Sequence, residues 1–129
     1  MSGWEESGGI SYNGWNGVGR VSKNVIGWNS SMDWSSVIKI DGRDSVMNNL
    51  IIENSSGRNI VDLGQLNGQQ FVNNNLRGNT APTITRMQLG WNNSTNSNTG
   101  SNTYDRNTAS EQVVLVEAGW SGQTSTVSM

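Results

Sequence analysis

The chain has 129 residues, a formal net charge of −2, and neither cysteine nor histidine. This length predicts a single domain, residues 1–129. The two missing residue types exclude disulfides, zinc sites built on Cys or His, and catalytic triads that use imidazole. The eight Lys and Arg residues form no basic stripe, which argues against nucleic acid as the main partner.

The ends and the apolar runs give little information on location. No apolar run approaches the roughly 18 residues of a membrane span, so membrane insertion is not expected. The first residues are acidic and show no signal-peptide pattern. The location is therefore left open between the cytoplasm and release without a classical leader.

Composition favours strands and turns. Val and Ile together number 19 against six Leu and three Ala, and there are 19 Asn and 16 Gly. β-Branched residues suit pleated sheets, whereas Asn and Gly are typical of turns. The sequence therefore predicts an all-β protein with little helix.

Turn signals divide the chain into short predicted strands. Asn13-Gly14 and Asn16-Gly17 predict a tight turn. A polar loop is predicted around 92–110, and the continuous apolar run 113–116 predicts a strand buried on both faces. The other predicted strands are 10–12, 18–26, 37–40, 46–53, 59–63, 71–77 and 83–89.

Short strands at this spacing predict an antiparallel β-sandwich, a jelly roll or a small barrel. The alternative is a β-solenoid, because Asn clusters separate apolar triplets over 46–80. No fixed period of 20–50 residues is evident along the whole chain, and this weighs against the solenoid.

Five of the six tryptophans directly follow a glycine, and several of these pairs close an apolar run. Such rings are expected where strands give way to loops, either as caps on the core or as binding surfaces. Three pairs are also followed by Asn, whose amide can hydrogen-bond a ligand. The predicted ligand-binding residues are Trp15, Asn16, Trp28, Asn29, Trp91 and Asn92.

Catalysis and metal binding have little support. Asp41 and Asp44 lie in a turn beside Arg43, and Glu117 is expected to point outward from its strand. No loop matches a calcium-binding pattern, although the turn at 41–44 and the segment near Asp105 supply oxygen ligands. We expect no enzyme activity, no catalytic residue, no metal and no cofactor.

The preferred functional interpretation is a non-enzymatic, lectin-like module that binds glycans or glycoconjugates, acting as a homo-oligomer that gains avidity. Two alternatives stay open. One is a structural, self-assembling subunit of a virion, fibre or surface layer, whose tryptophans make subunit contacts. The other is a small enzyme.

Overall fold

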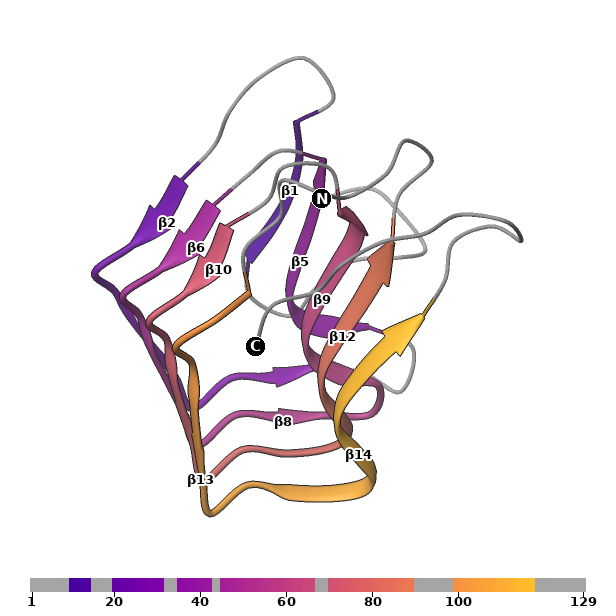
Figure 1. The fold of residues 1–129 in the computed structure, drawn as a ribbon. Helices are drawn as coiled ribbons and strands as arrows, with labels where there is room; N and C mark the ends of the chain where they lie inside the picture. Colours follow the sequence, from indigo (N-terminus) through magenta and orange to yellow (C-terminus); the bar gives the residue numbers. More distant parts are fainter. Residues whose placement is uncertain are drawn as a thin grey trace.

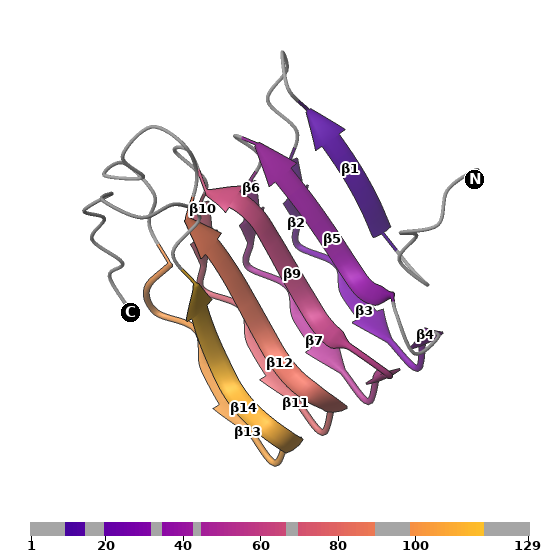
Figure 2. The ribbon, with the colours of Figure 1, turned by 90° about the vertical axis from the view of Figure 1, so that its right-hand side faces the viewer.

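All strand pairs in the structure are parallel, and the chain winds into successive coils of a β-solenoid (Figures 1 and 2). The structure is a computed structural model, and it describes residues 10–14, 20–31, 35–42, 45–66, 70–89 and 99–117. Within these ranges it contains strands and no helix.

After β1 (Ile10–Gly14), the described strands fall into four coils. Coil 1 holds β2 (Arg20–Ser22), β3 (Val25–Gly27), β4 (Ser30–Ser31) and β5 (Ser36–Gly42). Coil 2 holds β6 (Ser45–Met47), β7 (Leu50–Ile52), β8 (Ser55–Ser56) and β9 (Asn59–Leu66). Coil 3 holds β10 (Gln70–Val72), β11 (Asn75–Arg77) and β12 (Thr80–Leu89), and coil 4 holds β13 (Thr103–Asp105) and β14 (Thr108–Glu117).

Stacking of the coils builds three sheets. The three-stranded sheet has the order β10-β6-β2, and the four-stranded sheet has the order β13-β11-β7-β3. The long sheet contains β1, β5, β9 and β12, with β14 on the far side of β12 and the short strands β4 and β8 beside its beginning. Figure 1 shows the three-stranded and long sheets on opposite sides of the coils.

Each coil turns two corners with the same backbone conformation. Positive φ angles occur at Lys23, Asn48, Asn73 and Ser101 in the first corner, and at Trp28, Glu53, Gly78 and Arg106 in the second. A non-glycine residue in this left-handed region is uncommon, and Asn tolerates it better than most. Such a strained corner persists only where the surrounding contacts fix it.

The residue after each strained position is always Asn, and these residues supply the contacts. Successive Asn side chains stack into two asparagine ladders. The first ladder is Asn24, Asn49, Asn74 and Asn102, and the second is Asn29, Asn54, Asn79 and Asn107.

Asn54 illustrates the bonding of one ladder step. Its Oδ1 accepts hydrogen bonds from the backbone N–H and the Nδ2 of Asn29, both at 3.0 Å. Its Nδ2 donates to the Ile26 carbonyl at 2.9 Å and to Oδ1 of Asn79 at 3.0 Å. The interior asparagines are buried, so each polar atom is satisfied by another coil instead of by water.

Apolar columns fill the interior between the ladders. In the four-stranded sheet Ile26, Ile51, Leu76 and Tyr104 occupy equivalent positions, and the first three are buried. Val46 and Phe71 do the same in the three-stranded sheet. The long sheet adds the buried side chains of Val37, Ile38, Ile40, Ile60, Val61, Leu63, Ile84 and Met87.

The predicted antiparallel sandwich, jelly roll or barrel is therefore wrong, and the alternative, the β-solenoid, matches the fold. Parallel neighbours need a long connection, and here one whole coil of 25 residues provides it. The period escapes a sequence search because only the ladder Asn and the inward residues must repeat. The last step also lengthens to 28 residues.

Three predicted strands are divided by these corners. The predicted strands 18–26, 46–53 and 71–77 each contain a ladder Asn, and the structure replaces them with β2 and β3, β6 and β7, and β10 and β11. β13 and the start of β14 lie within the predicted polar loop 92–110. β14 is not buried on both faces, because Val113 and Val116 are 43% and 40% exposed.

We expect substitution of a ladder asparagine to destabilise the fold strongly. Asn54→Ala removes four hydrogen bonds and leaves the buried Ile26 carbonyl without its Asn54 donor. Each buried polar group left unpaired costs about 1–3 kcal/mol, so a loss of about 3 kcal/mol or more is expected in urea unfolding. Asn75→Ala, which changes an exposed Asn in a strand, should cost less than about 0.5 kcal/mol. Equal losses for the two variants would contradict the structural role of the ladder.

Alkaline pH should weaken the fold through Tyr104. Burial raises the pKa of its hydroxyl above the ordinary value, and the hydrogen bond to Thr85 Oγ1, at 3.1 Å, acts in the opposite direction. The unfolded chain therefore loses this proton at lower pH than the folded chain. The contribution of Tyr104 to the free energy of unfolding is fully present below about pH 10, and it is lost as the pH rises through the folded-state pKa. Urea unfolding between pH 9 and 11 should show a smaller decline for Tyr104→Phe than for the native chain. An identical decline would mean that Tyr104 ionises freely in the folded state.

Candidate functional site

The second corner of coil 1 places a tryptophan ring on the outside of the solenoid. Trp28 has a φ of 58° and is 73% exposed, the largest exposed fraction among the large hydrophobic residues of the described ranges. Its backbone N–H donates to the Ile52 carbonyl, so the corner is bound to the next coil. The ring is therefore exposed on a fixed backbone.

Outward residues of β3 and β7 extend this exposed surface. Side chains alternate along a strand, so the inward positions of Ile26 and Ile51 place their neighbours on the outer face. Val25 lies beside Leu50, and Gly27 lies beside Ile52. We call Val25, Trp28, Leu50 and Ile52 the apolar face.

Gly27 shapes the centre of the apolar face. A Cβ at this position would lie 2.9 Å from Cγ2 of Ile52 and 3.0 Å from its carbonyl oxygen. A side chain at this position would therefore require the Ile52 side chain and, by a few tenths of an ångström, its carbonyl to shift. The absence of a side chain at Gly27 thus lets Ile52 of the second coil approach the backbone beside Trp28 closely.

Polar groups border the apolar face on the following coils. Glu53 occupies the corner position next to Trp28, and Arg77 and Asp105 continue the row of Gly27 and Ile52. Arg77 Nε lies 3.6 Å from Asp105 Oδ2, and Arg106 Nε lies 3.2 Å from the same oxygen. The outer surface of the four-stranded sheet thus changes from apolar to charged along the solenoid.

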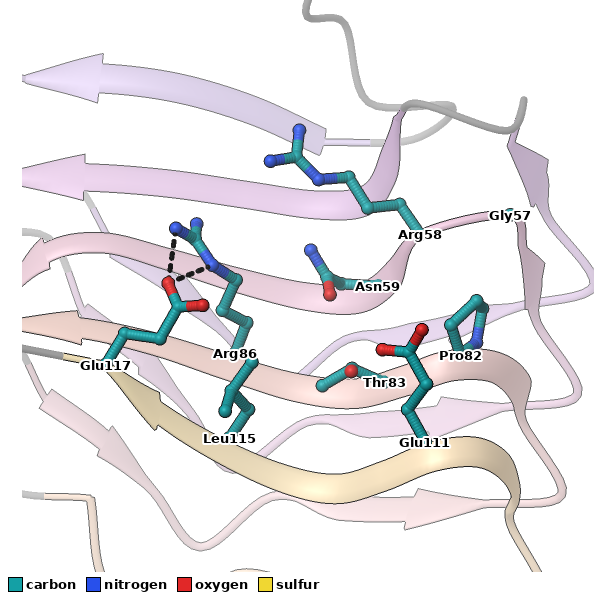
Figure 3. Close-up of a pocket in the computed structure, with 9 residues that line it drawn as sticks. All are labelled: Gly57, Arg58, Asn59, Pro82, Thr83, Arg86, Glu111, Leu115 and Glu117. Atoms are coloured by element: carbon teal, nitrogen blue, oxygen red, sulfur yellow. Dashed lines mark hydrogen bonds and ion pairs between the residues drawn. The ribbon is translucent and has the colours of Figure 1, made fainter.

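A second concave surface crosses the long sheet. It is an open polar trough of about 290 Å³ over β9, β12 and β14 (Figure 3). Its rim contains the corner at Gly57 and Arg58 and, in the next coil, the irregular part of β12 around Pro82. The lining residues are Gly57, Arg58, Asn59, Pro82, Thr83, Arg86, Glu111, Leu115 and Glu117.

An ion-pair network fixes the floor of the trough. Arg86 Nη1 lies 2.9 Å from Asp62 Oδ1, and its Nε and Nη2 lie 2.9 and 2.8 Å from Glu117 Oε2. Burial acts against the charge of Arg86, but the attraction of Asp62 and the bonds to Glu117 outweigh it and raise the pKa of the guanidinium. Both carboxylates are thus engaged by one cation, an arrangement that suits structural support better than acid–base chemistry.

The predicted site residues have different outcomes. Trp28 lies outward, as a ligand-binding residue requires. Asn29 belongs to the second ladder, since its backbone N–H and Nδ2 both donate to Asn54 Oδ1. Trp15, Asn16, Trp91 and Asn92 lie outside the described residues.

The neighbours of Trp28 on the apolar face are not predicted from the sequence. Val25 lies in the predicted strand 18–26, and Leu50 and Ile52 lie in the predicted strand 46–53, but neither strand by itself indicates that the two are neighbours. The signal that connects them is the spacing of 25 residues between Asn24 and Asn49, which aligns Val25 with Leu50.

Within the described ranges, no group of three or more acidic side chains is arranged to hold a metal ion. Asp105, one of the predicted oxygen ligands, is instead paired with Arg77 and Arg106. In the part of the chain that the structure describes, there is also no helix of the length and apolarity needed to cross a membrane.

Comparison with known proteins gave no match among family models, curated proteins or solved structures. Functional inference for this chain therefore depends on its own residues and geometry.

Removal of the cation in the trough should be costly. Arg86→Leu leaves the Asp62 carboxylate, 3% exposed, without its partner, and an uncompensated buried charge typically costs about 3–5 kcal/mol. Glu117→Gln removes the more exposed carboxylate, 40% exposed, and should cost about 1 kcal/mol or less. Urea unfolding of both variants at pH 7 measures the difference. A ranking in the opposite order would show that Asp62 does not depend on Arg86.

Proposed function

We propose that this protein is a non-enzymatic carbohydrate-binding module and that its apolar face receives the sugar. The observation that carries the proposal is the Trp28 ring, which is exposed at a corner fixed by hydrogen bonds to the next coil. An aromatic ring and an apolar surface with nearby polar groups are the usual elements of a small-ligand site.

The chemistry of a sugar fits this surface. The C–H groups on one face of a pyranose ring can pack on the indole and on the flat surface formed by Gly27 and Ile52. The hydroxyl groups at the edge of the sugar can then meet Glu53 and Arg77, which supply a hydrogen-bond acceptor and donors. Because the ladder already fixes the corner, little backbone conformational entropy is lost on binding.

The trough on the long sheet is a weaker candidate for this role. Its nine lining residues include no aromatic side chain, and its most buried cation is already bound by two carboxylates. Polar groups alone exchange water for sugar hydroxyls with little net gain.

A single open site of this kind binds weakly, so avidity would be needed for firm attachment to a glycan surface. We propose that the protein acts as a homo-oligomer, in which several apolar faces bind one glycan-covered surface together.

The second candidate function is a structural, self-assembling subunit. It is supported by a separate observation: among the described residues, Oδ1 of Asn24 and Asn29 in coil 1 accepts no hydrogen bond, and the backbone N–H groups of Asn102 and Asn107 in coil 4 donate none, so the asparagine ladders are open at these two ends. The two functions are compatible, because the apolar face lies on the flank of the solenoid and the open ladders lie at its ends.

Trp28→Asn should weaken glycan binding at least tenfold while the fold is kept. Asn is chosen because Asn48 and Asn73 already occupy left-handed corners of this solenoid. A glycan array identifies the ligand class with the native chain, and isothermal titration with a ligand from that class should show at least a tenfold loss of affinity in the variant.

Arg106→Asn is the matched control, since it changes the same corner position in coil 4. We expect its affinity to equal that of the native chain. Unchanged affinity in Trp28→Asn, or no glycan bound by the native chain at millimolar concentration across broad classes, would reject the proposal.

A further inference from the structure

The two ends of the described solenoid hold opposite halves of the same hydrogen-bond pattern. In coil 1, Oδ1 of Asn24 and of Asn29 accepts no bond from any described residue, although every later ladder Oδ1 accepts bonds from the preceding Asn. In coil 4, the backbone N–H groups of Asn102 and Asn107 donate to no described residue, although every earlier ladder N–H donates to the following Asn. Among the described residues, the acceptors at the coil 1 end thus have no donors, and the donors at the coil 4 end have no acceptors.

We propose that coil 4 of one molecule binds coil 1 of a second copy, so that both asparagine ladders continue from one molecule into the next. In this arrangement the N–H groups of Asn102 and Asn107 donate to Oδ1 of Asn24 and Asn29 in the second copy. The five-residue separation is the same at both ends, so the two bonds form in a single register.

The strand edges agree with this register. Within the described residues, β13 and β14 are paired only with β11 and β12, and the opposite edge of each is open. β2, β3 and β4 are likewise paired on one side only. Open edges of parallel strands with matching corners are templates for another coil.

Some of the apolar columns also end incompletely, although Ile26 at the coil 1 end is buried. Tyr104, Ala109 and Val114 pack against the core but are only partly buried, whereas the equivalent Leu76, Ala81 and Thr85 are buried. At the other end Val21 is partly buried, whereas Val46 is buried. A further coil at either end would bury these side chains as the interior coils bury theirs.

The charges of the two ends are complementary. Residues 20–31 contain Arg20 and Lys23 and no acid, a charge of +2. Residues 99–117 contain one cation, Arg106, and three acids, Asp105, Glu111 and Glu117, a charge of −2. Opposite charges favour the head-to-tail encounter and disfavour contact between two identical ends.

One strand competes with this assembly. β1 pairs with β5 so that Ile10 lies beside Ile38, and in the last coil the position equivalent to Ile38 belongs to Val114. The end of β14 and the β1 of the second copy therefore need the same edge of β5. β1 has five residues and β14 has ten, so we expect β1 to leave β5 when the copies bind.

A head-to-tail contact uses different surfaces on the two partners. After each addition the series therefore still has one free coil 1 end and one free coil 4 end. The expected product is an open linear series whose length rises with protein concentration. β1 raises the concentration at which the series begins to form.

Engineered cysteines test the register directly, because the native chain contains none. Ser30, Ser55, Thr80 and Thr108 are aligned across the coils, and Ser30 and Thr108 are exposed. In the proposed stack, Ser30 of the second copy lies one strand spacing, about 4.8 Å, from Thr108, within disulfide range. Within one molecule the same two positions are three spacings apart, roughly 14 Å, which is too far for a disulfide.

Oxidation of the double variant Ser30→Cys/Thr108→Cys should therefore give a series of covalent dimers, trimers and larger species on a non-reducing gel. The yield should rise with protein concentration, and reduction should return the monomer. A mixture of the two single variants should give a heterodimer as its main covalent product, without larger species.

The matched control is Ser30→Cys/Gln112→Cys, which moves the second cysteine four residues along β14, roughly 13 Å out of register. Circular dichroism melting should show that both double variants remain folded. Equal cross-linking in the two variants would show random collision, and an absence of multimers in both would show that the ends do not bind; either result overturns the proposal.

Hydrogen exchange of the unmodified full chain gives an independent readout. Amides of residues 10–14 should lose protection as the protein concentration rises, while those of β13 and β14 should gain it. Unchanged exchange, with a monomer in sedimentation at every concentration, would overturn the assembly without affecting the proposed glycan binding, since Trp28→Asn tests that function separately.

Discussion

The bond between successive ladder asparagines is the interaction on which the rest of the solenoid depends. Seven non-glycine residues in the described ranges adopt positive φ, and each of them immediately precedes a ladder Asn. The strained corners persist because each ladder Asn side chain of coils 2 to 4 accepts from a backbone N–H and donates to a backbone carbonyl of the preceding coil. The ladders therefore fix the register of the strands that flank these two corners in each coil.

The ladders constrain the inward residues, whereas the outward residues can vary from coil to coil. Inward positions repeat as Ile26, Ile51 and Leu76, whereas the corner row reads Trp28, Glu53, Gly78 and Arg106. A solenoid can thus change its outer surface without loss of its fold. For this reason the surfaces considered for function, the apolar face and the polar trough, consist mainly of outward residues from neighbouring coils.

Part of this arrangement could be predicted from the sequence. The all-β class follows from Val, Ile and Asn, and the position of Trp28 after a strand and before a polar run predicts a ring at a strand end, whereas its exposure is known only from the structure. The apolar face could not be predicted, because Val25 and Leu50 meet only when a 25-residue coil closes. The sequence predicts ligand binding by Asn29, whereas its amide bonds to Asn54, because an Asn beside a Trp has the same sequence pattern in both cases.

By itself, the sequence determined that the chain forms strands and corners, since side-chain shape and backbone preference act within a few residues. Only the tertiary structure decided that the strands run parallel, that the asparagines stack, and which outward side chains become neighbours. The physical reason is that the deciding hydrogen bonds join residues 25 or 28 positions apart, and their geometry exists only after the coils have stacked.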